Sequence, residues 1–133
     1  MAENNDTPVV LKIDSFEDRE VLAVDYKFAQ ATGTDGQIDG NPRGGELVIR
    51  VKARNDGNNQ LVQWMLEPDT ARDVEVSFTN VLDGSTMKSI KGKGCYCFRY
   101  IEKWEDGEMH YEEISIVCQE LSNGNVEFKN KWA

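Results

Sequence analysis

The sequence from Tyr26 to Ala53 is YKFAQATGTDGQIDGNPRGGELVIRVKA, and it predicts two β-strands separated by a long loop. Apolar residues alternate with polar ones on both sides of the loop, the period of two that is typical of half-buried strands: Leu22, Val24, Tyr26 and Phe28 before it, and Leu47, Ile49 and Val51 after it. A tight hairpin turn would have joined two antiparallel strands at lower entropic cost. A long loop without a periodic pattern is more often functional than accidental in a compact domain. We therefore expect Ala31–Gly45 to be a contact loop.

The rest of the chain predicts a mainly β protein. Short alternating segments joined by turn sequences recur along the chain and give about seven or eight strands in total. Most of the connections have the length and composition of hairpins. The expected fold is therefore an antiparallel β-barrel or β-sandwich, formed by a single domain over residues 1–133 with a flexible lead at residues 1–7.

One segment follows a helical period instead. Between residues 59 and 67, Leu61 and Met65 lie four positions apart with Trp64 beside them, and Pro68 ends the pattern. The preceding cluster of Asn and Asp residues at 55–59 can supply an N-cap. A lone short helix must be held by packing, so we expect Trp64 and Met65 to plug one side or end of a β core.

Aromatic residues on the strands complete the expected core. Phe78 lies on the apolar face of a strand predicted at 72–81, and Trp132 closes the chain. In the segment Cys95–Trp104, the aromatic series Tyr96, Phe98 and Tyr100 alternates with Cys97 and Arg99. Such a series could form a stacking platform for single-stranded nucleic acid or a sugar, but core packing is its commoner role, and we expect Phe98 to point inward.

Two short segments are expected to interrupt the strands. Asp14–Arg19 is rich in charge and predicts a turn. Lys91-Gly92-Lys93-Gly94 has the composition of a phosphate-binding loop but lacks both the Walker spacing and a following helix. A β-bulge or a strand break is the better interpretation.

Composition excludes several classes of protein. The chain has 24 acidic and 15 basic residues, a formal net charge of −9, which disfavours binding to the phosphate backbone of nucleic acids. The start of the sequence carries neither the positive region nor the apolar stretch of a signal peptide. No apolar run is long enough to span a bilayer. We expect synthesis in the cytoplasm, no membrane insertion and no nucleic-acid partner.

Catalytic and metal-binding patterns are also missing from the sequence. Cys95, Cys97 and Cys118 fit no common ligand spacing with His110, the one histidine of the sequence, and are predicted to be buried free thiols. There is no nucleophile elbow, no H-E-x-x-H motif and no legible pair of catalytic carboxylates. The prediction is a protein without enzymatic activity, metal or cofactor.

Several short motifs occur in an order that resembles a known family. They are Asp35-Gly36 followed by Arg43-Gly44-Gly45 and an alternating strand, the helical segment Leu61–Met65 with its Trp-Met pair, the aromatic strand Tyr96–Tyr100, and the ending Asn125–Trp132. Together they resemble the Hcp/TssD tube proteins of bacterial type VI secretion, in the branch found in Bacteroidetes, over about Leu11 to Trp132. The sequence departs from that pattern at residues 37–39, which read Gln-Ile-Asp where the family usually has Arg-Pro-Ser, and at Phe128, which replaces a His.

The resemblance implies a structural function. Six copies would close into a ring, rings would stack into a hollow tube, and a contracting sheath would drive the tube and its cargo out of the cell. The implied partners are other copies of the chain and the sheath, spike and effector proteins of the system. A loop at this place in the family reaches the neighbouring ring, and the residues expected to make that contact are Asp35, Gly36, Asp39, Arg43, Gly44 and Gly45. The alternative is a monomeric β-sandwich that binds a carbohydrate or small ligand through exposed aromatic residues.

Overall fold

Strands dominate the computed structural model, which describes residues 8–30, 33–37 and 44–130. Seven strands and one helix lie in this part of the chain: β1 (Val9–Ile13), β2 (Arg19–Tyr26), β3 (Glu46–Lys52), α1 (Gln60–Met65), β4 (Arg72–Thr79), β5 (Thr86–Lys103), β6 (Tyr111–Asn123) and β7 (Val126–Lys129). The predicted mainly β fold with one short helix is confirmed.

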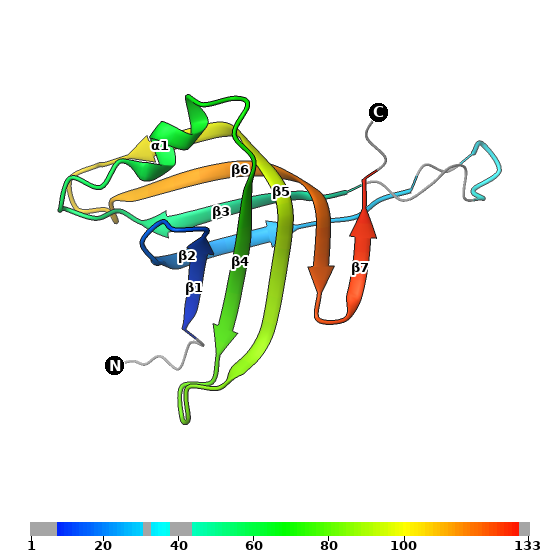
Figure 1. Ribbon diagram of the computed structural model, residues 1–133, viewed down its shortest axis with the longest axis horizontal. Helices are drawn as coiled ribbons and strands as arrows, with labels where there is room; N and C mark the ends of the chain where they lie inside the picture. Colours follow the sequence, from blue (N-terminus) through cyan, green and yellow to red (C-terminus); the bar gives the residue numbers. More distant parts are fainter. Residues whose placement is uncertain (1–7, 31–32, 38–43, 131–133) are drawn as a thin grey trace.

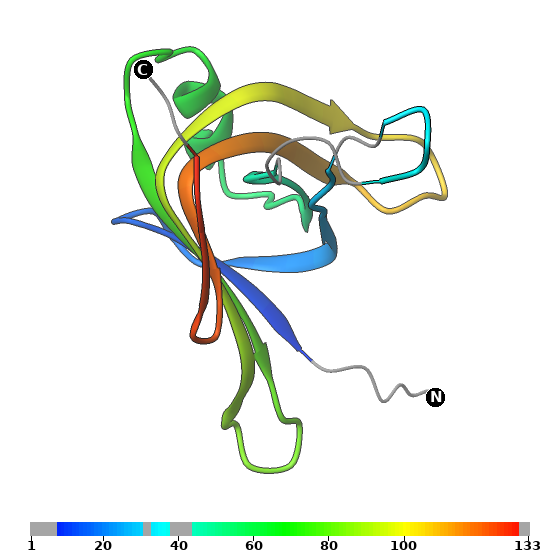
Figure 2. The same cartoon turned by 90° about the vertical axis from the view of Figure 1, so that its right-hand side faces the viewer.

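The strands form one antiparallel sheet that closes on itself (Figures 1 and 2). Its order among the described residues is β3-β2-β1-β4-β5-β6-β7, and β3 also pairs with β6. That additional pairing closes a six-stranded barrel and leaves β7 as an extra strand. The first part of β6 pairs with β3 up to Val117, and its last part pairs with β7 from Glu120 onward. Closure pairs the strand edges that an open sheet would expose.

Aliphatic side chains fill the barrel, and α1 covers them with Trp64. The buried hydrophobic residues include Leu11, Ile13, Leu47, Ile49, Val51, Leu61, Val74, Val76, Ile90, Ile114, Ile116 and Leu121. Trp64 is 1% exposed, and its indole Nε1 donates a hydrogen bond to the carbonyl of Thr70 at 2.9 Å. Met65 and Phe78 are partly buried against the same core, whereas Trp132 lies outside the described residues.

The helix is shorter than the predicted 59–67, and its start is held by a different residue. Asn59 occupies the N-cap position without a side-chain hydrogen bond. Instead, Asn58 Oδ1 accepts from the amide of Gln60 at 3.0 Å, and Asp56 Oδ1 accepts from the amide of Asn58 at 3.0 Å. The polar cluster therefore shapes the entry turn, because its side chains bond within the turn before the helix begins.

The prediction that Phe98 belongs to the core is wrong. Phe98 is 49% exposed, while Cys95 and Cys97 face the barrel interior at 0% and 7% exposure. The pairing of β5 with β6 shifts register between Cys97 and Arg99. An alternation of cysteine with aromatic residues has two apolar faces, so the pattern alone cannot tell which one is inside. The small thiols of Cys95 and Cys97 face the interior and Phe98 turns outward, while Tyr100 packs partly against the core.

Two further register shifts explain differences from the predicted strands. On β2 the shift lies between Val21 and Ala23, and it places Leu22 outward at 38% exposure, against the expectation that it shares a face with Val24. On the β4 side of β5 a shift lies beside Gly94, whose φ is 61°. The predicted bulge in Lys91–Gly94 is therefore present, and β5 runs through it without a break.

A buried ion pair lies inside the barrel wall where a turn was predicted. Arg19 begins β2 and is 4% exposed, so the expectation that it belongs to a charged turn is wrong. Its Nη2 donates to Glu112 and to the carbonyl of Lys52 at 3.0 Å. The hydroxyl of Tyr100 donates to the other oxygen of Glu112 at 2.5 Å. Burial together with this carboxylate raises the pKa of Tyr100.

Candidate assembly surface

The loop between β2 and β3 projects away from the barrel (Figure 1), and its described segment 33–37 is a self-contained turn. The amide of Gly33 donates to the carbonyl of Gln37 at 2.8 Å, and Gly36 has a φ of 84°. The carboxylate of Asp35 accepts a hydrogen bond from the amide of Gln37 at 3.0 Å. Asp35 and Gly36 are therefore presented on a shaped, exposed turn. Asp39 and Arg43 lie outside the described residues.

Gly44 and Gly45 fix the base of this loop. A Cβ at Gly44 would lie 2.2 Å from Cδ1 of Phe28, and a Cβ at Gly45 would lie 2.9 Å from the carbonyl oxygen of Cys118. Gly45 also has a φ of 90°, a backbone angle that residues with a side chain rarely adopt. The side-chain amide of Asn130 donates to the carbonyls of Gly44 at 3.3 Å and Cys118 at 2.8 Å. These contacts hold the two ends of the loop in place, because they pack them against β6 and the end of β7.

An apolar groove lies next to the loop base. It is lined by Tyr26, Phe28, Leu121, Ser122, Asn123, Val126, Glu127 and Phe128 and encloses about 490 Å³; we call it the aromatic groove. Phe28 packs edge-on against Tyr26 with ring centroids 5.8 Å apart, and against Phe128 at 4.9 Å. Phe28 remains 45% exposed and Val126 69% exposed. An exposed apolar groove is a candidate surface for contact with another molecule.

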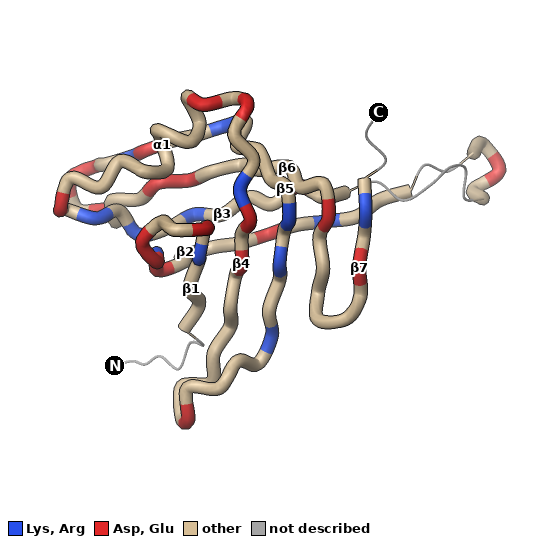
Figure 3. The backbone as a smooth tube through the Cα atoms, viewed as in Figure 1, with Lys and Arg blue, Asp and Glu red and all other residues tan. Residues whose placement is uncertain are grey.

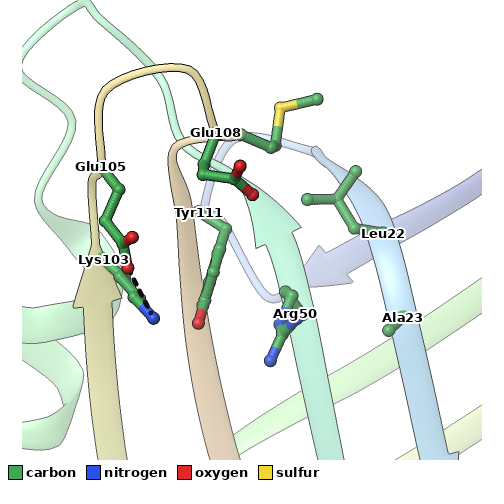
Figure 4. Close-up of a pocket in the computed structure, with 8 residues that line it drawn as sticks. Leu22, Ala23, Arg50, Lys103, Glu105, Glu108 and Tyr111 are labelled. Carbon is green, nitrogen blue, oxygen red and sulfur yellow. Dashed lines mark ion pairs between the residues drawn. The ribbon is translucent and has the colours of Figure 1, made fainter.

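A second hollow near the β5–β6 turn has a different character (Figure 4). It encloses about 330 Å³ between β2, β3 and the turn, and its two cations, Arg50 and Lys103, are already paired. The guanidinium of Arg50 lies 4.1 Å from the ring centre of Tyr111 and 3.1 Å from Glu113. Lys103 Nζ lies 2.9 Å from Glu105, and this hydrogen bond raises the pKa of Lys103. A hollow whose cations are already paired is a weaker candidate for binding another molecule than the aromatic groove is.

No constellation for chemistry appears in the part of the chain that the structure describes. There is no group of three or more His, Cys, Asp or Glu residues that could hold a metal ion. His110 Nε2 lies 2.8 Å from Glu102 Oε2 on the exposed surface of the β5–β6 hairpin. The three cysteines are free and buried. Within residues 8–30, 33–37 and 44–130, the notable features are therefore surfaces suited to contact with another molecule.

Sequence reasoning identified the loop but missed the aromatic groove. Its residues come from both ends of the sequence, since Tyr26 and Phe28 precede the loop while Val126 and Phe128 lie on β7. One signal was present, because Phe128 stands where the resembling family has a His. The phenyl ring at that position makes the groove more apolar than a histidine would.

Comparison with known proteins identifies the family. The family model described as Hemolysin coregulated protein Hcp (TssD) matches residues 6–133. The chain belongs to the Hcp (TssD) family. The resemblance drawn from the sequence motifs is therefore confirmed. No curated protein sequence matches the chain.

Solved structures agree with this assignment. Hcp1 from Flavobacterium johnsoniae is 28% identical, with a TM-score of 0.85 over 92% of this chain and 99% of that chain. Hcp1 from the E. coli EAEC 042 pathovar is 13% identical, with a TM-score of 0.75 over 96% and 99%. A protein in the six-fold symmetrised cryo-EM structure of the anti-feeding prophage baseplate is 10% identical, with a TM-score of 0.58 over 92% and 95%. The last two similarities concern the fold alone.

Family membership gives the chain its function. It is a tube subunit of type VI secretion, a structural protein of a family that is secreted through the type VI apparatus. Among the described residues, no helix is long and apolar enough to cross a membrane. Acidic residues lie in the turns and on several strands, while basic residues are spaced along β5 (Figure 3).

Proposed function

We propose that six copies of this chain close into a ring and that the rings stack into a hollow tube that carries effectors. The aromatic groove is the observation that carries this proposal. A groove lined by Tyr26, Phe28, Val126 and Phe128 is costly to leave in water, because burying apolar surface is worth about 25 cal/mol per Å². In a ring, every copy offers that groove to its neighbour.

A closed ring requires contact between two different surfaces of the same chain. The groove lies beside β7, whereas the hollows near the β5–β6 turn and beside Arg19 have charged linings. A contact between two different surfaces of the same chain is heterologous, and heterologous contacts close into rings when the rotation between copies divides a full turn. The six-fold symmetry stated for the anti-feeding prophage baseplate supports six copies.

The projecting loop is proposed to join one ring to the next. Its described turn holds Asp35 and Gly36 away from the barrel, and Gly44 and Gly45 hold its base. We assign the polar contacts to Asp35, Asp39 and Arg43, with Arg43 offering two parallel donors to a carboxylate of the neighbouring ring. Sheath, spike and effector proteins of the type VI system are the remaining proposed partners.

Light scattering after size-exclusion chromatography tests the ring. The purified chain is expected to elute as a species of six times its 15.1 kDa mass. Val126→Lys places a charge in the aromatic groove and is expected to give monomers. Leu66→Lys is the matched control, because Leu66 is 74% exposed but lies beside α1 and not in the groove.

Circular dichroism shows that both variants are folded before their masses are compared. A wild-type monomer at micromolar concentration contradicts the ring, and it would favour the carbohydrate- or ligand-binding module. A ring that survives Val126→Lys contradicts the assignment of the groove alone. A ring lost equally in both variants shows that added charge, and not its place, causes the loss.

A further inference from the structure

Two of the three cysteines face each other across neighbouring strands of the barrel. Cys95 on β5 is the register partner of Cys118 on β6, and both are 0% exposed. A Cβ at Gly92 would lie 2.6 Å from the sulfur of Cys118 and 2.8 Å from that of Cys95. Both sulfurs therefore fill the space over one glycine, and they are free thiols in this structure.

We propose that Cys95 and Cys118 form a cross-strand disulfide once the subunit has left the reducing cytoplasm. Residues directly opposite each other in an antiparallel pair have Cα atoms about 4.5–5.5 Å apart. That spacing lies inside the range of about 4.4–6.8 Å found for disulfides. The register therefore places the two Cα atoms at a spacing that a disulfide can span.

Cys97 is unsuited to the same reaction. Its register partner on β6 is Ile116, and its sulfur lies 3.9 Å from the sulfur of Met65. A disulfide between Cys95 and Cys97 would join residues two apart on one strand, where Cα atoms lie about 6.5–7 Å apart. The geometry therefore selects one pair out of three.

The reaction needs an oxidant of the low-molecular-weight disulfide class, such as glutathione disulfide. The thiolate of one cysteine attacks the oxidant and releases one glutathione, which leaves a mixed disulfide. The other cysteine then attacks the protein sulfur of that mixed disulfide and releases a second glutathione. Two protein thiols are oxidised, one glutathione disulfide is reduced to two glutathione molecules, and the two thiol protons pass to them.

Burial slows this reaction, and the redox state of the compartment decides whether its product persists. A hydrogen bond in which the Cys95 thiol donates to Cys118, together with burial, raises the pKa of Cys95 and favours its protonated form. The cytoplasm keeps thiols reduced, whereas disulfides persist outside the cell. The inference rests on the secretion of this family, and it does not depend on the ring or on stacking.

Gly92 is the positioning residue for the pair. Its missing side chain leaves the volume that the sulfurs occupy, and it is itself buried. A disulfide there would join β5 to β6 through the segment 95–118 and restrict the unfolded chain. The exported subunit would then be harder to unfold than the same subunit before export.

The test equilibrates the full chain through its unfolded state, so that slow access to the buried sulfurs does not decide the outcome. Protein unfolded in urea is refolded in a buffer of oxidised and reduced glutathione. Intact mass is expected to fall by about 2 Da, with peptide mapping placing the bond between Cys95 and Cys118. The midpoint of thermal unfolding is expected to rise by about 5–10 °C relative to the reduced protein.

Matched variants separate the pair from general oxidation. Cys97→Ala is expected to keep the mass change, and Cys118→Ala to lose it. Three free thiols in refolded wild type, a bond that includes Cys97, or an oxidised form that melts below the reduced form would each overturn the proposal. The same measurement on Val126→Lys distinguishes its failure from failure of the ring, because a monomer contains the same cysteine pair.

Discussion

The barrel interior and the aromatic groove are both apolar, yet they are covered in different ways. The interior is sealed by its own strands and by α1, so that Leu11, Ile49 and Trp64 are at most 1% exposed. In the groove, Phe28 is 45% and Val126 69% exposed. The interior stabilises one chain, whereas the groove becomes favourable only when a second molecule covers it. The difference separates the residues that make the subunit from those that let it assemble.

Charged residues show the same division. Arg19 and Glu112 are nine-tenths buried or more and bonded to each other within the barrel wall, while Arg54 pairs with Glu17 and Asp56 at the surface. Surface pairs of this kind contribute little to stability, because water and salt screen them. Changes in the barrel should therefore alter the free energy of unfolding, and changes at the loop and groove should alter assembly.

The largest effect on stability is expected from Trp64→Ala. It removes a buried aromatic side chain and the hydrogen bond to Thr70, and truncations of this kind cost about 3–5 kcal/mol. Urea unfolding measures the loss. Trp104→Ala is the control, because Trp104 is 65% exposed and its removal should change the free energy of unfolding by less than about 0.5 kcal/mol. Equal losses in the two variants would remove the distinction between interior and surface.

A smaller loss is expected from Arg19→Ala. It leaves the carboxylate of Glu112 buried without its cation, which costs about 3–5 kcal/mol in buried pairs. The lower end of that range applies, because Nε and Nη1 of Arg19 are themselves buried without a hydrogen-bond partner among the described residues. Adding Glu112→Gln should recover part of the stability in urea unfolding. A double variant less stable than Arg19→Ala would show that Glu112 stabilises the barrel by other contacts.

Tyr100 should make stability depend on alkaline pH. Its folded pKa lies above the ordinary value near 10, chiefly because of burial and then because of Glu112. Because the pKa is raised in the folded state, the contribution of Tyr100 to stability is complete below about pH 10. It is lost as the pH rises through the folded pKa. The midpoint of thermal unfolding should fall less steeply between pH 8 and pH 11 in Tyr100→Phe than in the wild type. Identical slopes would exclude this role of Tyr100.

The smallest effect on stability is expected from the loop. Replacing Thr34–Arg43 by a short Gly/Ser turn should change the free energy of unfolding by less than about 1 kcal/mol, since loop-closure entropy varies slowly with length. Rings should form, but electron microscopy should show no stacked tubes, and the protein should be missing from culture supernatant. Normal tubes and export would contradict the assignment of the loop, and loss of the ring would move its role to ring closure.

Local patterns were sufficient for much of the fold. Alternation placed Leu47, Ile49 and Val51 on one inward face, and helical spacing located α1 around Trp64. These features depend on neighbours in the sequence, since a strand has a period of two and a helix a period of 3.6. The order of short motifs from Asp35 to Trp132 was enough to recognise the family.

The remaining features depend on residues far apart in the sequence. β3 closes the barrel on β6 across about half of the chain, Arg19 binds Glu112, and Phe28 packs against Phe128. Whether Phe98 or Cys97 faces inward on β5 depends on the width of the closed barrel and on a register shift, which local alternation does not encode. The sequence by itself therefore determined the elements and the family, while the inward face of β5, the buried ion pair and the aromatic groove required the closed sheet, because only closure brings their residues together.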